Sequence, residues 1–280
     1  MKLIQEWQRD FRIKNGLGKV FFSEPEKIEK KAEPLAFQAH TLLNIPQDWF
    51  LQVNSPEKAF KYLRHKVEST GITIVLNGKV GNDTHRVLSI EEFRAFALYD
   101  EYAPLIFLNN CDSQTGLIFS LLHEFFHILT GTTNIINGSD SFSDENLCNK
   151  AAIAFLAPTT YLEKQWYVLN SFSVYEKISK IAGQLKISDI ALAYKLLSLR
   201  YISEKEVAVI KEKQNLVLKY KKKSGGNYWN TKINTFSKHF VESVIADVYA
   251  GGTSYTESFK LLGIKNGMQL KRLEREIADA

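Results

Sequence analysis

The chain has 280 residues, of which 45% are hydrophobic and 12% aromatic, enough to bury one large core or two smaller ones. Its two cysteines, Cys111 and Cys148, are too few for a disulfide framework and favour a reducing compartment. The N-terminal residues MKLIQEWQRDFRIK lack the apolar core of a secretory signal, and the most apolar run, Leu117 to Leu129, is too short to span a bilayer. We therefore predict a globular, cytoplasmic protein without a membrane partner.

The net charge of +5 is unevenly spread, because residues 1–160 carry a net charge of −3 and residues 161–280 one of +8. A basic half of this kind can attract nucleic acid or an acidic partner, but we favour a solvated, lysine-rich surface. The lysines at 219 and 221–223 are interpreted in the same way, as part of a solvated loop.

The N-terminal part of the chain has the apolar spacing of helices. Residues 1–55 form a predicted helical lead-in, with the pattern clearest from Pro25 to Leu43. A further helix is predicted from Pro56 to Glu68, where PEKAFKYLRHKVE repeats apolar residues at helical spacing. Gly71 follows at the place where such a helix would stop.

Three short strands are predicted next, at Ile72–Leu76, Phe93–Tyr99 and Leu105–Leu108, because these segments are β-branched, aromatic or alternate large and small residues. We expect Leu105–Leu108 to pair with an extended substrate, as an edge strand does.

Two helices that carry most of the polar residues of interest should follow the strands. The first is capped by Asp112 or Ser113 and ends at Gly131, which can adopt the left-handed conformation of a helix C-terminus. The second is predicted to begin near Ser143, whose hydroxyl can cap it, and to run to Leu156.

Beyond residue 160 the pattern is almost entirely helical, so we divide the chain into a lead-in (1–55), a core (56–160) and a helical C-terminal subdomain (161–280). The segment TSYTESFKLLGIKNGMQLKRL has a helix-turn-helix rhythm, with Gly263 at the turn. It lacks a clear arginine-rich recognition face, and we favour a packing or substrate-docking role over DNA binding.

Residues 123–127 form the motif H-E-x-x-H. On a helix the i, i+4 spacing places His123 and His127 on one face, where their imidazoles can hold one zinc ion. Glu124 points to the side of that face and is expected to act as a general base on water. Metal coordination also explains why two histidines and a glutamate lie within an otherwise apolar helix.

A catalytic zinc ion usually has three protein ligands, so a third ligand is needed. Glu145 at the start of the next helix is one candidate, with Asp140 and Asp144 as rival oxygen ligands. Asn149 follows Glu145 at i+4 on the same face, which makes it a candidate partner of a ligand or a residue that stabilises the helix interface. These ligand types also leave manganese and iron open.

Other candidate residues are interpreted as structural. Cys148 lies next to the predicted site, but its position favours a small buried residue, and Cys111 is interpreted likewise. The remaining histidines show no ligand spacing to one another and are assigned to the surface or core: His40, His65, His85 and His239.

HEFFHILTG followed by ENLCNKAAIAFLAP resembles the ImmA/IrrE family of metallopeptidases, which pairs HExxH with a downstream E-x-x-A-N-x-F-A-x-x-L-L-x-P. The matching residues are Glu145, Asn149, Ala152, Leu156 and Pro158. Cys148 replaces the usual Ala and Ala151 the usual Phe, but the ligand position is intact. The resemblance extends over roughly residues 56–280, although the N-terminal helix-turn-helix of many members is not found here.

The resemblance implies an α+β fold that is mostly helical: a zincin-like core with a short three-stranded sheet and an HExxH helix, followed by a helical C-terminal subdomain. It also implies a zinc endopeptidase that inactivates a helix-turn-helix repressor or antitoxin of a mobile genetic element or stress-response locus. The residues themselves support peptide hydrolysis with Glu124 as base. The alternative is a regulatory protein that binds a repressor or DNA without cleaving it.

Overall fold

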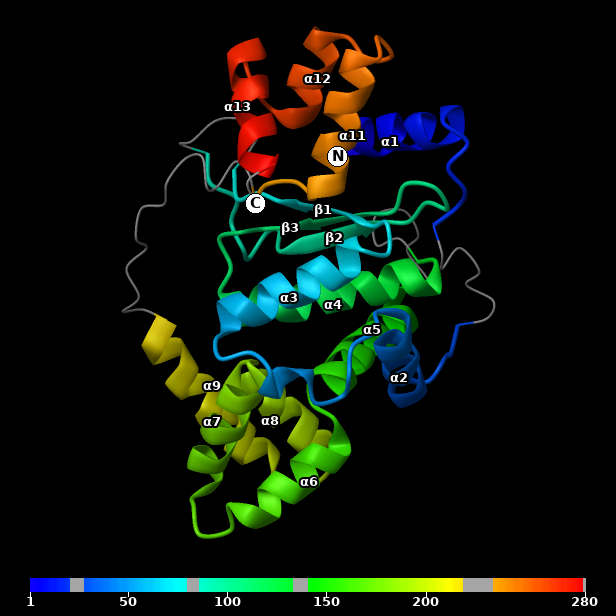
Figure 1. Cartoon of the computed structure of the whole chain (residues 1–280). Coiled ribbons are helices and arrows are strands. Elements are labelled where there is room, and N and C mark those ends of the chain that lie inside the picture. The colour runs from blue at the N-terminus through cyan, green and yellow to red at the C-terminus, as the bar shows by residue number, and fades with distance from the viewer. Residues whose placement is uncertain (21–27, 80–85, 133–140, 219–233, 279–280) are drawn as a thin grey trace.

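A computed structural model of the chain describes residues 1–20, 28–79, 86–132, 141–218 and 234–278. The elements are arranged in layers, with a small sheet covered by helices on both faces (Figure 1). The fold is α+β and mostly helical, as predicted from the sequence. The lysines at 219 and 221–223, His85 and Asp140 lie outside the described residues.

The first helices of the chain are α1 (Lys2–Lys14), α2 (Ala32–Leu42) and α3 (Pro56–Glu68), with a 3₁₀ turn at Trp49–Leu51 between the last two. The strands are β1 (Thr73–Leu76), β2 (Ala95–Leu98) and β3 (Leu105–Leu108). The later helices are α4 (Gln114–Thr130), α5 (Ser141–Leu156), α6 (Thr159–Val168), α7 (Val174–Leu185), α8 (Asp189–Ser198), α9 (Glu204–Leu218), α11 (Lys238–Tyr249), α12 (Tyr255–Leu262) and α13 (Gly267–Ala278).

The sheet has the strand order β1-β3-β2, with β1 parallel and β2 antiparallel to β3. The prediction that Leu105–Leu108 forms an edge strand is therefore wrong, because β3 lies in the centre. Its side chains show the reason. All four are buried, Ile106 and Leu108 on one face and Leu105 and Phe107 on the other. A continuous apolar run is typical of a strand that is covered on both faces.

The outer edge of β1 is closed by the segment that leads into α11. The N–H of Leu76 donates to the carbonyl of Thr235 at 2.7 Å, and the N–H of Ser237 donates to the carbonyl of Ile74 at 3.1 Å. The Ser237 hydroxyl also accepts from the N–H of Ile74 at 2.7 Å. The outer edge of β2 is consequently the edge of the sheet at which an added strand could pair.

The peptide groups of β2 alternate in direction. The carbonyl of Arg94 accepts from the N–H of Asn109 in the continuation of β3, at 2.8 Å. Because hydrogen-bonded and non-hydrogen-bonded pairs alternate along an antiparallel ladder, the N–H and C=O groups of Ala95 and Ala97 face away from β3. They therefore lie along the outer edge of the sheet.

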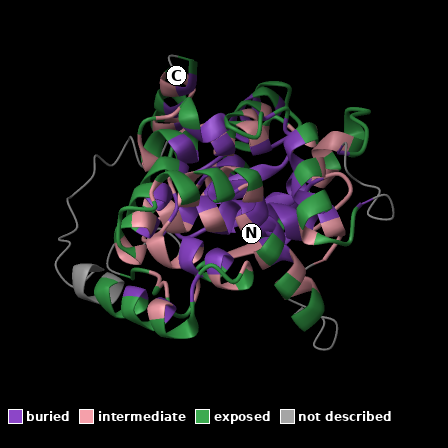
Figure 2. Ribbon diagram, turned by 90° about the horizontal axis from the view of Figure 1, so that it is seen from below, coloured by how far each residue is buried: buried purple, intermediate pink, exposed green. Residues whose placement is uncertain are grey.

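Two hydrophobic cores lie on opposite faces of the sheet. The larger core packs the lower face against α2–α9, and the smaller packs the upper face against α1 and α11–α13. The buried residues accordingly occupy the interior of the molecule in Figure 2. Residues 161–280 thus contribute helices to both ends of the molecule, and the predicted boundaries near residues 55 and 160 stay a prediction.

Candidate metal centre

Helix α4 carries the HExxH motif and is fixed at both ends. The hydroxyl of Ser113, rather than the side chain of Asp112, accepts from the N–H of Gly116 at the N-terminus. Gly131 ends the helix in the left-handed conformation (φ 71°), which is the conformation a glycine adopts at little cost. Between these caps, nearly every residue from Leu117 to Leu129 is buried, so the motif lies inside a helix that has little freedom to move.

Helix α5 brings Glu145 to the two histidines. The helix begins at Ser141, so Ser143 lies within its first turn and is not the N-cap that the sequence predicted. Helix ends are poorly determined by apolar periodicity alone. Packing of α5 against α2 and α4 then places Glu145, one turn into the helix, opposite the HExxH face.

Three side-chain donors converge between α4 and α5. The Nε2 atoms of His123 and His127 are 3.1 Å apart, and each is 3.3 Å from an oxygen of Glu145. Two ligands bound tetrahedrally at about 2.1 Å from one ion would be about 3.4 Å apart, so this spacing fits a single metal ion. Among the described residues these three form the group that can hold a metal, and Asp144 is not part of it.

The charges of the three donors are coupled. Hydrogen bonds to His123 and His127 hold the pKa of the Glu145 carboxyl far below its usual range. Burial lowers the pKa of His123, but its hydrogen bond to Glu145 and the charges of Glu124 and Glu145 reverse the shift, and the pKa is raised overall. Glu145 is therefore ionised and can act as an anionic ligand.

Glu124 is almost fully buried beside this group. One of its oxygens, Oε2, is buried without a hydrogen-bond partner among the described residues. Its carboxylate also interacts with the backbone of Ala97 in β2, whose N–H is the donor. Burial raises the pKa of Glu124 to about 7, a value suited to a group that accepts and returns a proton near neutral pH. A buried oxygen without a partner needs a polar group, such as water, in the adjacent space.

Thr132 supports the orientation of His127. Its hydroxyl lies 2.8 Å from His127 Nδ1, and a second hydroxyl, that of Thr130, lies 3.0 Å from Thr132 Oγ1. The contact to Nδ1 leaves Nε2 directed at His123 and Glu145. Thr132 directly follows the left-handed Gly131, so the end of α4 also helps to orient the His127 ring.

We expect Thr132→Val to lower metal affinity by about 10- to 100-fold, because partners that orient a metal-binding histidine typically contribute this much. Competition with a chromophoric zinc chelator would measure the affinity. Thr41→Val, at an exposed position of α2, is the control and should leave the affinity unchanged. An unchanged affinity for Thr132→Val would show that Thr132 does not support His127.

Asn149 also lies at the group. Its amide Nδ2 donates to Glu145 Oε1 at 3.3 Å, and its side chain interacts with His123 as well. The side chain thus contacts one predicted ligand from each helix. Its predicted role as a partner of the ligands rests on these two contacts.

The residues of this site lie in a part of the chain that matches a known protein family. Residues 67–197, from the end of α3 through α8, match the family model of the IrrE N-terminal-like domain, Peptidase_M78. The chain contains an M78 metallopeptidase domain. The match includes the HExxH motif and Glu145, and it confirms the predicted resemblance to the ImmA/IrrE family for residues 67–197.

A second family match lies in the C-terminal part of the chain. Residues 236–276, which include α11, α12 and nearly all of α13, match a second family model, a domain of unknown function (DUF8813). No curated protein was found to match the chain. Within the described part of the chain, no helix is both long enough and apolar enough to cross a membrane.

Three other candidate side chains, those of Cys148, His40 and His239, are not part of the metal-binding group. Cys148 is fully buried on α5, where burial raises the pKa of its thiol to about 12. His40 is buried against Phe155, and His239 lies next to Thr73. Neither histidine forms a metal-binding group with the residues described.

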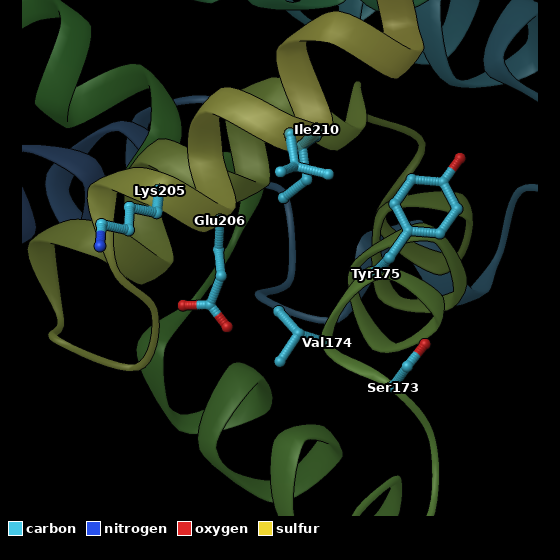
Figure 3. A pocket seen from close by; sticks show the side chains of 7 residues that line it. Ser173, Val174, Tyr175, Lys205, Glu206 and Ile210 are labelled. Atoms are coloured by element: carbon cyan, nitrogen blue, oxygen red, sulfur yellow. The ribbon is translucent and has the colours of Figure 1, made fainter.

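A cleft of about 290 Å³ opens onto the metal centre. Its lining comes from the start of β2, from α4 and from α5: Arg94, Ala95, Phe119, Ser120, His123, Glu124, Glu145 and Asn149. An apolar hollow elsewhere is lined by residues of α7 and α9, with Val174, Tyr175 and Ile210 around it (Figure 3). Two of its polar residues, Ser173 and Glu206, are used in helix capping, and it contains none of the converging metal-binding donors, so the cleft at the metal centre is the better candidate for catalysis.

Two contributors to the site were not predicted from the sequence. Thr132 follows a C-terminal glycine, which is a signal that could have pointed to it, because a residue after such a cap turns back towards the helix. Ala97 contributes through its backbone, and no side-chain pattern can reveal that role.

Proposed function

We propose that this chain is a zinc endopeptidase that cleaves a helix-turn-helix repressor or antitoxin. The observation that supports this proposal is the convergence of His123, His127 and Glu145 within 3.1–3.3 Å, beside a buried glutamate with one unpartnered oxygen. Two imidazoles and a carboxylate are a ligand set that peptidases use for catalytic zinc. The M78 match supports the peptidase reaction.

Glu124 is assigned the proton transfers. A zinc ion held by the three ligands would act as the Lewis acid that polarises the scissile carbonyl and makes the attacking water more acidic. Glu124 would accept the proton of that water on its unpartnered Oε2 and then deliver it to the leaving amine nitrogen. The N–H of Ala97, which donates to the carboxylate, holds Glu124 in position for both transfers.

The edge of β2 is the place where we expect the substrate backbone to bind. The peptide group of Ala95 faces away from β3 and lines the cleft, so an extended polypeptide can add to the sheet at this position. We therefore expect β2 to pair with an extended substrate, the role that the sequence suggested for Leu105–Leu108. This arrangement brings the backbone of a substrate past Glu124, which contacts the next outward-facing peptide group at Ala97.

The identity of the substrate is supported by the family resemblance alone. The test is to incubate the zinc-loaded protein with each helix-turn-helix protein found to be encoded near its gene and to analyse the products by mass spectrometry. We expect one internal peptide bond to be cut. An intact partner in a stable complex would favour the alternative, a regulatory protein that binds the repressor. Binding to DNA by the C-terminal helices that weakens steeply with salt would favour a nucleic-acid module.

A further inference from the structure

The catalytic cleft carries a cation at the end where β2 begins. Among the described residues that line the cleft, Arg94 has the only permanent positive charge. Its side chain is 59% exposed, although it lies at the same cleft as the buried donors of α4. An exposed guanidinium keeps most of its five N–H donors available for a ligand.

Arg94 is held by an anchor that is itself fixed. Its Nε lies 3.2 Å from Asp112 Oδ2, and the Asp112 side chain is only 9% exposed. The other Asp112 oxygen accepts from the N–H of Ser113 at 2.7 Å. A β-carbon at Gly116 would collide with the Asp112 carboxylate, so the glycine leaves the space that this anchor needs. The ion pair therefore ties Arg94 to the segment that leads into α4.

We propose that Arg94 binds an acidic side chain of the polypeptide substrate and so contributes to the choice of cleavage site. This inference rests on the proposed peptidase function. A guanidinium that is anchored through Nε can still bind a carboxylate through its terminal nitrogens, and Arg–carboxylate pairs are stronger and more directional than neutral hydrogen bonds. The rival interpretation is that Arg94 only neutralises Asp112.

The strand geometry predicts where the acidic residue lies. Glu124 contacts the backbone of Ala97, which places the scissile bond near this residue. Arg94 precedes Ala97 by three residues, or about 10 Å along an extended strand. A substrate strand that pairs with β2 has the same rise per residue. The acidic side chain is therefore expected about three residues from the scissile bond, on one side of it.

The test compares binding of labelled peptides to the cleavage-deficient Glu124→Gln protein loaded with zinc. Three pools of twelve-residue peptides share a randomised sequence and differ only at the two positions three residues from the central bond, where they carry Glu, Gln or Lys. Fluorescence anisotropy gives the dissociation constants. We expect the Glu pool to bind roughly tenfold more tightly than the Gln pool, and the Lys pool more weakly than both.

Variants in the same background identify the residue responsible. Arg94→Ala should remove the preference for the Glu pool, and Arg94→Glu should invert it in favour of the Lys pool. Arg275→Ala, at an exposed position of α13, should retain the preference, and thermal melting of all variants confirms that they fold. Equal affinity of the parent protein for the Glu and Gln pools, or a preference that persists in Arg94→Ala, would overturn the proposal.

A second measurement separates this inference from the proposed function. The protein with Glu124 intact is incubated with the same pools, and cut bonds are identified by mass spectrometry. Retained selectivity for the Glu pool without any cleavage would contradict the peptidase function and leave the role of Arg94 in binding intact. Cleavage of all pools without any selectivity for Glu would support the peptidase and overturn the role of Arg94.

Discussion

Glu124→Gln is expected to lower kcat/KM for peptide cleavage by about 10²- to 10⁴-fold, the range that general acid–base catalysis contributes. The amide has nearly the same shape as the carboxylate but cannot accept a proton from water. Metal binding should persist, because Glu124 is not one of the three converging donors. Steady-state kinetics on the cognate substrate and elemental analysis of the purified variant measure the two quantities separately.

The matched control is Glu163→Gln, which makes the same chemical change at an exposed position of α6. It should leave both cleavage and metal content unchanged. If Glu124→Gln cut its substrate at the parental rate, another group would have to act as the base. Loss of metal together with activity would instead place Glu124 among the ligands and contradict the assignment of roles.

The sequence predicted the local features of this site because they depend on spacing within one element. The i, i+4 separation places His123 and His127 on one face of α4 whatever surrounds the helix, and Ser113 and Gly131 determine its ends. Glu145 could be preferred over Asp144 only through the family pattern. In the structure it is Glu145 whose oxygens lie near both imidazoles.

The sequence could not predict features that depend on long-range pairing. Strand order is set by contacts between segments far apart in the chain, such as Ser237 with Ile74 at the outer edge of β1. That contact decides which edge is closed, and no local pattern near residues 105–108 contains this information. The helices after residue 234 likewise cover the upper face of the sheet, away from α6–α9, although both groups have similar helical patterns.

The backbone interaction between Ala97 and Glu124 illustrates the same limit. It depends on the register of β2 against β3 and on the depth at which α4 packs under the sheet. Each is a tertiary property. The sequence predicted a general base, but the group that positions it became apparent only once the strand and the helix were placed together.

Removal of the metal is expected to destabilise the protein. Without an ion, two buried imidazole nitrogens face one another at 3.1 Å beside the Glu145 carboxylate, an arrangement in which bound metal relieves the cost of burial. An ion that binds only the folded state stabilises it by about 4 kcal/mol when its free concentration is 1,000 times Kd. Chelation should therefore lower Tm, as differential scanning fluorimetry of the zinc-loaded and chelated protein would show.

The pH dependence of the rise in Tm on adding zinc provides a second test of the metal centre. The pKa of His123 is raised in the metal-free protein, so a proton competes with the ion for Nε2, and the rise of Tm on adding zinc should be smaller at pH 5.5 than at pH 8. His127→Ala should abolish the rise, whereas His65→Ala, at an exposed position of α3, should retain it. If chelation left the Tm of the parent protein unchanged, this would contradict a metal centre at these residues.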